Sequence, residues 1–320
     1  MKAFYTLILV LLTGTAFGQS NLPACQGNDV FKWSNCIGEE TINDRHQYKG
    51  EFLNGLEGEE ILALAESEDF SFADVDDLGT YKKNKKYLKK HHNNLLQLPT
   101  ADISQLIENS SELNHYTFLG GGSLPTDIAL LKSLSKKIPN CSYFEIGTWR
   151  GESVINVSET AEECFTLNLS KDDILAEGLP EKYADLHGIL SKERDNITHL
   201  FGNTLNYDFS VLGKKFDLIF IDGNHKYEFV KNDTKKVFSH LVHKDSIVVW
   251  HDYAANPEKT RYDVLAGILD GLPKEKQANL YHVSNSLCAI YYPNGLESKS
   301  IDFPILPKKL FKLIIQSKEI

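Results

Sequence analysis

The sequence lacks an excess of positive charge and a long apolar run. Its 34 Lys and Arg residues are outnumbered by 44 Asp and Glu residues, giving a formal net charge of -10. This balance argues against a general nucleic-acid surface. The leading apolar stretch, Ala3 to Leu12, is too short to cross a bilayer comfortably as a permanent helix. An apolar fraction of 42% still suffices to build a globular core.

That leading stretch has the features of a secretory signal peptide. Lys2 precedes it, and Ala16 and Gly18 occupy the minus-three and minus-one positions of a cleavage site. Residues 1–18 are therefore predicted to be a leader, and the mature chain to be secreted or periplasmic. An uncleaved anchor is the minority interpretation, and a cytoplasmic location for the main domain is the alternative.

Cysteine is scarce, with five residues in 320. In an exported chain Cys25 and Cys36 would plausibly form a disulfide. Cys141, Cys164 and Cys288 adjoin or lie in predicted core strands, so we expect buried thiols there.

The segment from Tyr48 to Gly58, Y-K-G-E-F-L-N-G-L-E-G, resembles a single MORN repeat. Such repeats are β-hairpins that stack on one another, and one repeat alone cannot bury its face. We expect residues 19–60 to form a small β-hairpin appendage. It either makes a protein or peripheral membrane contact or serves as a short structural cap.

The run that begins at Tyr143 predicts a buried strand that turns sharply into a helix through Gly147 and Gly151. Glu145 stands just before the turn, where its carboxylate can orient an amino group or a ribose. The spacing E-x-G-x-x-x-G lacks the third glycine of the dinucleotide fingerprint, so a cofactor without phosphates suits it better. The alternative is an ordinary strand-to-helix turn, in which Arg150 is a surface cation.

Two further apolar runs end at Asp222 and at His251. Runs rich in Ile, Val and Phe suit strands buried on both faces of a parallel sheet. Ligands of such sheets bind beyond the carboxyl ends of the strands. Asp222, His225, His251 and Asp252 all fall at this position.

The apolar runs predict a parallel sheet closed by one antiparallel hairpin. The expected strands cover 143–147, 163–169, 197–201, 216–222, 246–251, 278–283 and 288–292. Intervening helical patterns, such as those at 151–161 and 227–241, indicate βαβ units with helices on both faces. The last two runs are too close for a crossover, so we expect them to form a hairpin at one edge. Before the sheet we expect a basic helix at 81–98, ended by Pro99, and a short helix at 102–114.

These blocks resemble the class I S-adenosylmethionine-dependent methyltransferases, in particular the branch with I-D-G-x-H-x-Y-E after its fourth strand and H-D-Y after its fifth. The resemblance covers roughly residues 116 to 293. It implies a Rossmann-like sheet in which Glu145, Gly147, Gly151 and Asp222 bind S-adenosylmethionine. Asn168 replaces the carboxylate that usually grips the ribose, and an amide makes a weaker, uncharged hydrogen bond there.

In the implied reaction His225 is the candidate general base and Asp222 its catalytic neighbour, because an imidazole titrates near neutral pH. His225 could instead cap the following helix. Asp222, His251 and Asp252 could hold a divalent metal such as Mg²⁺, as in catechol-type relatives. The simpler interpretation is that Asp222 orients loop amides and Asp252 stabilises its turn.

The expected organisation is a leader, the MORN-like segment, a helical linker or lid, the methyltransferase domain and a tail; their ranges are 1–18, 19–60, 61–115, 116–295 and 296–320. The basic run in the linker could steer an acidic substrate or touch anionic lipid, although such runs are usually solvated faces. The tail mixes apolar residues with lysines and could lie on a membrane; packing back onto the domain is more common.

The sequence therefore predicts a methyltransferase of the EC 2.1.1 class, acting on an oxygen or nitrogen of a small-molecule or saccharide-like acceptor. The alternative is a catalytically inactive, exported Rossmann-like binding or scaffold module. Export and methylation fit together poorly, since the cofactor is kept inside cells. Asn-x-Ser/Thr triplets within the domain favour a bacterial source, where they carry no glycan. The acceptor and the oligomeric state are not specified.

Overall fold

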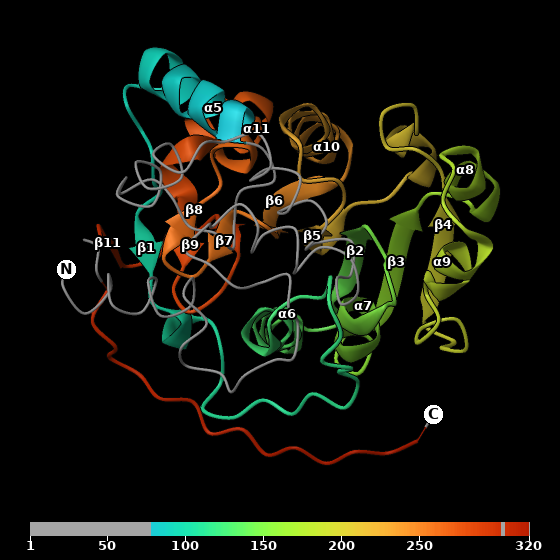
Figure 1. The fold of residues 1–320 in the computed structure, drawn as a ribbon. Coiled ribbons are helices and arrows are strands. Elements are labelled where there is room, and N and C mark those ends of the chain that lie inside the picture. Colours follow the sequence, from blue (N-terminus) through green and yellow to red (C-terminus); the bar gives the residue numbers. More distant parts are fainter. Residues whose placement is uncertain (1–77, 302–304, 320) are drawn as a thin grey trace, which may run out of the picture. The chain divides into compact units, whose positions relative to one another are not determined.

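The computed structural model describes residues 78–301 and 305–319 (Figure 1). Almost all of these residues belong to one compact unit, Tyr81–Ile320. The predicted leader, N-terminal disulfide and MORN-like hairpin lie outside the described residues. No helix in the described part is long and apolar enough to span a membrane.

A nine-stranded sheet with the order β11-β1-β9-β10-β6-β5-β2-β3-β4 forms the centre of this compact unit (Figure 1). Its strands are β1 Thr100–Ala101, β2 Ser142–Ile146, β3 Glu163–Asn168, β4 Ile197–Phe201, β5 Phe216–Ile221, β6 Val242–Trp250, β9 Leu280–Val283, β10 Ala289–Tyr291 and β11 Ser298–Lys299. The neighbouring strands β6, β5, β2, β3 and β4 all pair in parallel. β10 is antiparallel to both β6 and β9. Two short strands, β7 Ala254–Asn256 and β8 Lys259–Thr260, form a separate antiparallel pair. The predicted α/β fold with a mostly parallel sheet and a late antiparallel hairpin is confirmed.

The prediction that the hairpin lies at one edge of the sheet is wrong. β1 pairs in parallel with β9, and β11 pairs antiparallel with β1, so the sheet continues for two more strands. The backbone carbonyls of Pro99 and Ala101 accept hydrogen bonds from the N–H groups of His282 and Ser284, at 2.9 and 3.0 Å. Strands of two residues carry no alternation for a sequence pattern to reveal.

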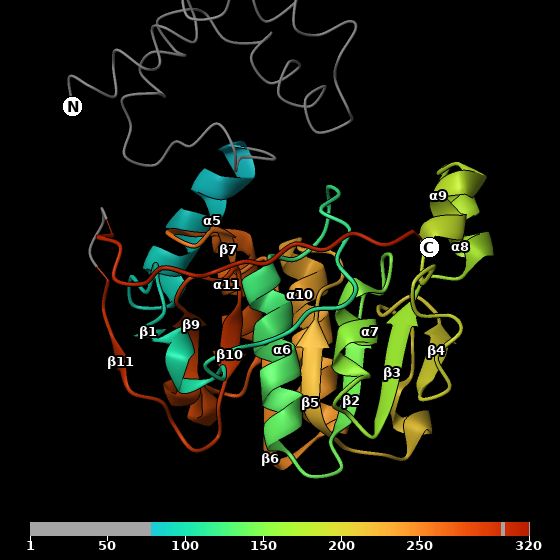
Figure 2. The ribbon, with the colours of Figure 1, turned by 90° about the horizontal axis from the view of Figure 1, so that it is seen from below.

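Helices cover both faces of the sheet, as predicted (Figures 1 and 2). The α-helices are α5 Leu78–His91, α6 Pro125–Lys137, α7 Glu152–Val157, α8 Lys171–Ala176, α9 Glu181–Leu186, α10 Tyr227–His240 and α11 Tyr262–Gly271. The described residues also form the 3₁₀ turns η2 Ile103–Gln105, η3 Phe209–Leu212 and η4 Lys274–Asn279. In β2, Phe144 and Ile146 pack with α10 and α11, whereas Tyr143 packs with α6 and α7. The alternation of this strand thus divides the core into two layers.

Two predicted helices are shorter than expected. α5 ends at His91, because Asn93 and Asn94 take left-handed φ angles of 52° and 61°. Asparagine tolerates this conformation better than most residues do. The helix expected at 102–114 is wrong: only η2 forms, and the Asp102 carboxylate accepts the Ser104 N–H at 2.9 Å. Such a local side-chain bond stabilises a turn at the expense of a longer helix.

The prediction of three buried thiols is confirmed, since Cys141, Cys164 and Cys288 are free and buried. Burial raises the pKa of Cys141 to about 12, which keeps the sulfur protonated and unreactive at neutral pH. The expectation that the tail packs back is wrong for its apolar side chains from Leu306 to Ile315, whereas Leu296 packs against the core. Residues 305–319 form no helix or strand, and Leu310 is 98% exposed.

Candidate active site

The glycine turn after β2 has the conformation that its sequence demands. Gly147 and Gly151 have φ angles of 92° and 86°, in the left-handed region. A Cβ on Gly147 would lie 2.0 Å from the Asp222 carbonyl oxygen, and a Cβ on Gly151 would lie 2.4 Å from Ser191 Oγ. Both glycines therefore let the turn pack against neighbouring loops. The Asp222 N–H also donates to the Ile146 carbonyl at 2.8 Å, so the ends of β2 and β5 meet here.

Glu145 lies beneath this turn and is fully buried. The Tyr143 hydroxyl donates to one carboxylate oxygen at 2.7 Å, and the Thr166 hydroxyl donates to the other at 3.3 Å. Burial raises the pKa of Glu145 to about 8, although these hydrogen bonds act in the opposite direction. The structure thus places Glu145 as an internal support of the turn, and direct contact with a cofactor stays a prediction.

Asn168 ends β3 beside the glycine turn. The Gly147 N–H donates to the Leu167 carbonyl at 2.9 Å, which holds the turn against the end of β3. The Asn168 side-chain amide donates to the Leu169 carbonyl at 3.0 Å. Among the residues that the structure describes, no hydrogen bond is recorded to its side-chain oxygen. That oxygen is the group available to accept a hydroxyl.

Arg150 is not the surface cation that we expected, because only 6% of the residue is exposed. Its guanidinium donates to the carbonyls of Gly120 and Leu119 at 3.1 and 3.2 Å and lies 3.4 Å from Glu152. Glu152 in turn accepts the Thr117 N–H at 2.7 Å. This buried pair ties the loop at 117–120 to the start of α7.

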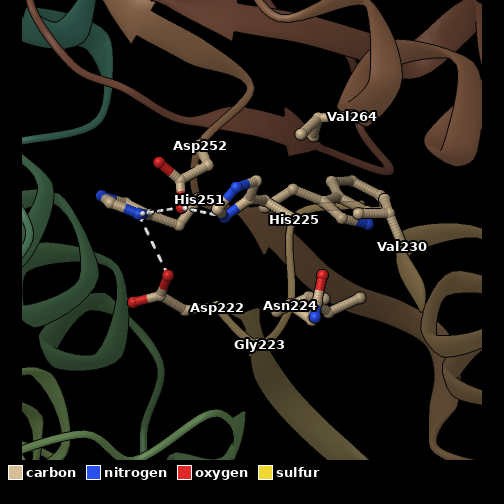
Figure 3. Close-up of a pocket in the computed structure, with 10 residues that line it drawn as sticks. Asp222, Gly223, Asn224, His225, Val230, His251, Asp252 and Val264 are labelled. Atoms are coloured by element: carbon tan, nitrogen blue, oxygen red, sulfur yellow. Dashed lines mark ion pairs between the residues drawn. The ribbon is translucent and has the colours of Figure 1, made fainter. Parts of the chain in front are cut away.

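A pocket opens beyond the carboxyl ends of β5 and β6 (Figure 3). It is lined by Ile221, Asp222, Gly223, Asn224, His225, Val230, Trp250, His251, Asp252 and Val264. The His251 N–H donates to the Ile221 carbonyl at 3.0 Å, which sets the two strand ends side by side. The four polar residues predicted from these strand ends are therefore brought together.

His251 is the buried centre of this group. Its Nδ1 lies 3.0 Å from an Asp222 oxygen and 3.5 Å from an Asp252 oxygen, and its Nε2 lies 3.2 Å from an Asp127 oxygen. Burial alone would lower the pKa of His251, but the charges of Asp222 and Asp252 and the bonds to Asp127 and Asp222 raise it well above its ordinary value. These carboxylates thus favour the imidazolium form of the ring, in which both nitrogens donate.

Asp127 is a site residue that the sequence analysis missed. It is fully buried in the first turn of α6, where its carboxylate accepts the N–H groups of Leu124 at 2.7 Å and Leu287 at 2.9 Å. Pro125 followed two residues later by an acid is a recognisable helix start. That signal explains the bond to Leu124, but the reach to His251 is set by tertiary packing.

Asp252 and His225 lie toward the mouth of the pocket. Asp252 has a left-handed φ of 54°, and its carboxylate lies 3.3 Å from Arg261 and 3.9 Å from His225 Nδ1. Burial would raise the pKa of Asp252, yet the charges of His251, Arg261 and His225 hold it well below its usual range. The His225 side chain is 39% exposed. It is therefore the imidazole of the two that a substrate can reach.

Asp222, His251 and Asp252 also satisfy the spacing of a metal site in the described part of the chain. One ligand atom from each lies within 4.8 Å of the others. His251 Nδ1 could bind a cation only after releasing the proton that it shares with Asp222, since a metal ligand must be the neutral imidazole. Mg²⁺ prefers oxygen ligands, which favours the two carboxylates over the ring.

Residues 144–253 match the model of a methyltransferase domain family. The matched range runs from Phe144 within β2 through β6, and it includes the glycine turn and the polar residues of the pocket. The match supports methylation that depends on S-adenosylmethionine, and it leaves the acceptor open. No curated protein matches the chain.

Solved structures resemble the chain at low identity and low TM-score. The chain is 14% identical to an O-methyltransferase from Bacillus cereus in complex with SAH, with 68% of this chain and 90% of that one covered and a TM-score of 0.35. It is 14% identical to cofactor-bound Rv0187 from MTB, with coverages of 68% and 92% and a TM-score of 0.35. It is 15% identical to YcgJ from Bacillus subtilis, with a TM-score of 0.28, covering 38% of this chain and 48% of that one. The chain thus spans about half the length of YcgJ, and at these TM-scores the similarities assign neither fold nor function.

Proposed function

We propose that the chain is an S-adenosylmethionine-dependent methyltransferase that acts on an oxygen or nitrogen of a small-molecule or saccharide-like acceptor. The observation that carries the proposal is the meeting of three strand ends, at Gly147, Asn168 and Asp222, beside a pocket that holds His225. Ligands of open α/β sheets bind at such an edge. The family match over the same strands supports this assignment.

The residues of the turn suit this cofactor. Trp149 Nε1 is buried next to Gly121 and has no hydrogen-bond partner among the described residues, so a hydrogen-bond acceptor on a bound ligand would satisfy it. Asn168 offers its oxygen to a ribose hydroxyl. When bound, S-adenosylmethionine supplies a methyl group that is already activated by its sulfonium.

The chain itself then has to orient the acceptor and take up its proton. His225 accepts that proton at the mouth of the pocket, and Asp252, 3.9 Å away, stabilises the resulting imidazolium. His251 is buried and held by three carboxylates, so it is not the base. A divalent metal at Asp222, His251 and Asp252 stays a prediction. Activity that is unchanged by EDTA would contradict it, and activity restored by Mg²⁺ would support it.

Cofactor binding is tested by calorimetric titration of S-adenosylmethionine into the full chain. A Gly147→Asp variant is a poor control, because any side chain there meets backbone atoms 2.0 Å away. Asn168→Asp is sharper: a carboxylate restores a charge-assisted bond to the ribose, and we expect affinity to rise about fivefold. Asn93→Asp makes the same change in an exposed turn remote from the pocket and should leave affinity unchanged.

Two outcomes would contradict the proposal. Absence of both heat and thermal shift at millimolar cofactor would leave the exported binding or scaffold module as the better interpretation. Equal affinities for all three proteins would show that Asn168 does not contact the ribose.

The role of His225 is tested separately. We expect His225→Gln to lower kcat at least about 100-fold with little change in cofactor affinity, because only proton transfer is removed. His240→Gln, an exposed histidine on α10, is the matched control. Retained kcat in His225→Gln would assign this residue to the structure of the loop.

A further inference from the structure

Residues 305–319, here called the basic apolar segment, present a row of aliphatic side chains to solvent. They run in an extended course with no helix or strand. The strongly exposed members are Leu306 at 73%, Leu310 at 98%, Leu313 at 65%, Ile314 at 75% and Ile315 at 70%. Single exposed aliphatic residues are ordinary, but five within ten residues are not. This row therefore needs a partner that the described chain does not provide.

The segment lies along the protein without being buried in it. Figures 1 and 2 both place it on the side of the sheet that α6 covers. Lys309 Nζ lies 2.6 Å from Asp102, which fixes one point of the segment next to η2. Beyond that point the residues from Leu310 to Glu319 are all exposed. The segment is thus tethered near its start and open along the rest.

Its charge is opposite to that of the whole chain. The segment contains Lys308, Lys309, Lys312 and Lys318 against a single acid, Glu319, whereas the chain has a formal net charge of -10. A basic segment on an acidic protein indicates an anionic partner. Lysine stems can also lie along an apolar surface while the ammonium groups reach water.

The spacing of these residues is helical, although the segment is not a helix in the structure. Leu306, Leu310, Leu313 and Ile314 recur at i, i+4, i+7 and i+8, which places them on one face at 3.6 residues per turn. Lys308 and Lys312 fall on the opposite side of that helix together with Ile315, and Lys309 borders the apolar face. One apolar face and one lysine face are typical of helices that lie in a lipid–water interface.

We propose that the basic apolar segment binds an anionic lipid surface and becomes an amphipathic helix there. The aliphatic face enters the boundary between headgroups and acyl chains, and the lysines contact anionic headgroups. The contact differs from the one predicted for the N-terminal segment, because it lies at the other end of the chain. It adds an interaction surface and does not depend on the methyltransferase assignment.

The test is co-sedimentation of the full chain with vesicles of phosphatidylcholine containing about 30% phosphatidylglycerol, against phosphatidylcholine alone. We expect binding to the anionic vesicles that weakens with salt. Leu310→Glu/Ile314→Glu should abolish it, because two charges would enter the apolar face. Val211→Glu, at an exposed apolar residue of η3, should leave it intact.

The charge requirement has its own matched pair. Lys308→Gln/Lys312→Gln should weaken partition at least about tenfold, since each lysine near an anionic surface contributes about fivefold. Lys86→Gln/Lys89→Gln removes two exposed lysines of α5 instead and should have little effect. Hydrogen exchange should slow at 305–319 only when anionic vesicles are present, as a helix forms.

Three results would overturn the proposal: no binding to anionic vesicles, equal binding by the Leu310→Glu/Ile314→Glu variant, or binding that is carried by another part of the chain. Concentration-dependent self-association that this variant abolishes, without vesicle binding, would identify a second copy as the partner.

Discussion

Among single residues, Glu145 is in the most unusual electrostatic position. Its carboxyl is fully buried, and burial raises its pKa from 4.5 to about 8. Between these values the folded protein keeps a proton that the unfolded chain releases. Stability therefore falls as the pH rises through this window. The buried carboxyl therefore destabilises the native state at neutral pH. Hydrogen bonds from Tyr143 and Thr166 hold it in place.

We predict that Glu145→Gln makes the unfolding free energy of the protein less dependent on pH between pH 5 and pH 8. The amide cannot ionise, so the loss of unfolding free energy between these values, on the order of 1.4 kcal/mol per pH unit in the wild type, should largely disappear. Urea unfolding across this range measures it, with the exposed Glu193→Gln as control. Parallel pH profiles for all three proteins would show that Glu145 does not titrate as argued.

Removing the charge of Asp127, in contrast, is expected to destabilise the protein. Asp127→Asn leaves the His251 imidazolium without one of its carboxylates and places an amide donor among three donors, so we predict a loss of about 1–3 kcal/mol. Chemical denaturation at pH 7 checks this. Asp172→Asn, in the exposed first turn of α8, should change stability by less than about 0.5 kcal/mol. Equal effects of the two changes would contradict the assigned role of Asp127.

The positions of Gly147, Asp222 and His251 at one edge could be predicted from sequence, because strand ends of a parallel sheet necessarily meet. The burial of Arg150 and the contact of Asp127 with His251 could not. Arginine is mostly exposed in proteins, and it is the loop at 117–120 that supplies the carbonyls to which Arg150 donates. Asp127 and His251 are 124 positions apart.

Among the elements, the turn between β2 and α7 depends most sharply on glycine. Gly151 and Gly178 have similar φ angles of 86° and 83°, but a Cβ on Gly151 would lie 2.4 Å from Ser191 Oγ, whereas Gly178 has open space. The two positions separate steric conflict from backbone strain.

We predict that Gly178→Ala costs about 1 kcal/mol of unfolding free energy, from strain alone. Gly151→Ala should cost at least about twice as much, and Ser191→Gly should recover part of the difference. Thermal unfolding of the three variants and the double mutant measures it. Additive effects in the double mutant would mean that the Ser191 contact is not the cause.

The longer strands and helices could be predicted because each carries several apolar residues in a fixed period. β4 begins and ends at the predicted residues, and β5 is one residue shorter than expected. β1 and η2 escaped prediction because two or three residues show no period. Their positions depend on Ser284, whose backbone and hydroxyl pair with them from the far end of the chain.

For the whole molecule, the contrast between the packed unit and the basic apolar segment predicts a cleavage order. Trypsin should cut after Lys308 and Lys312 at least about tenfold faster than after Lys86 and Lys89. All four are exposed, but α5 holds the latter pair in a helix. Mass spectrometry of a time course checks this. Simultaneous cleavage at both places would indicate that α5 opens as readily as the segment.

The two short strands beyond the hairpin, β1 and β11, also affect whether the edge of the sheet can pair with a strand of another molecule. Without β1, the four residues of β9 would form an open edge whose unpaired N–H and C=O groups could recruit a strand from another molecule. β1 covers two of them, and β11 then ends that side of the sheet after two residues, Ser298 and Lys299, both exposed. An edge this short and polar presents few backbone groups with which a strand of another molecule could pair. β1 and β11 therefore protect the folded protein against aggregation through this edge of the sheet.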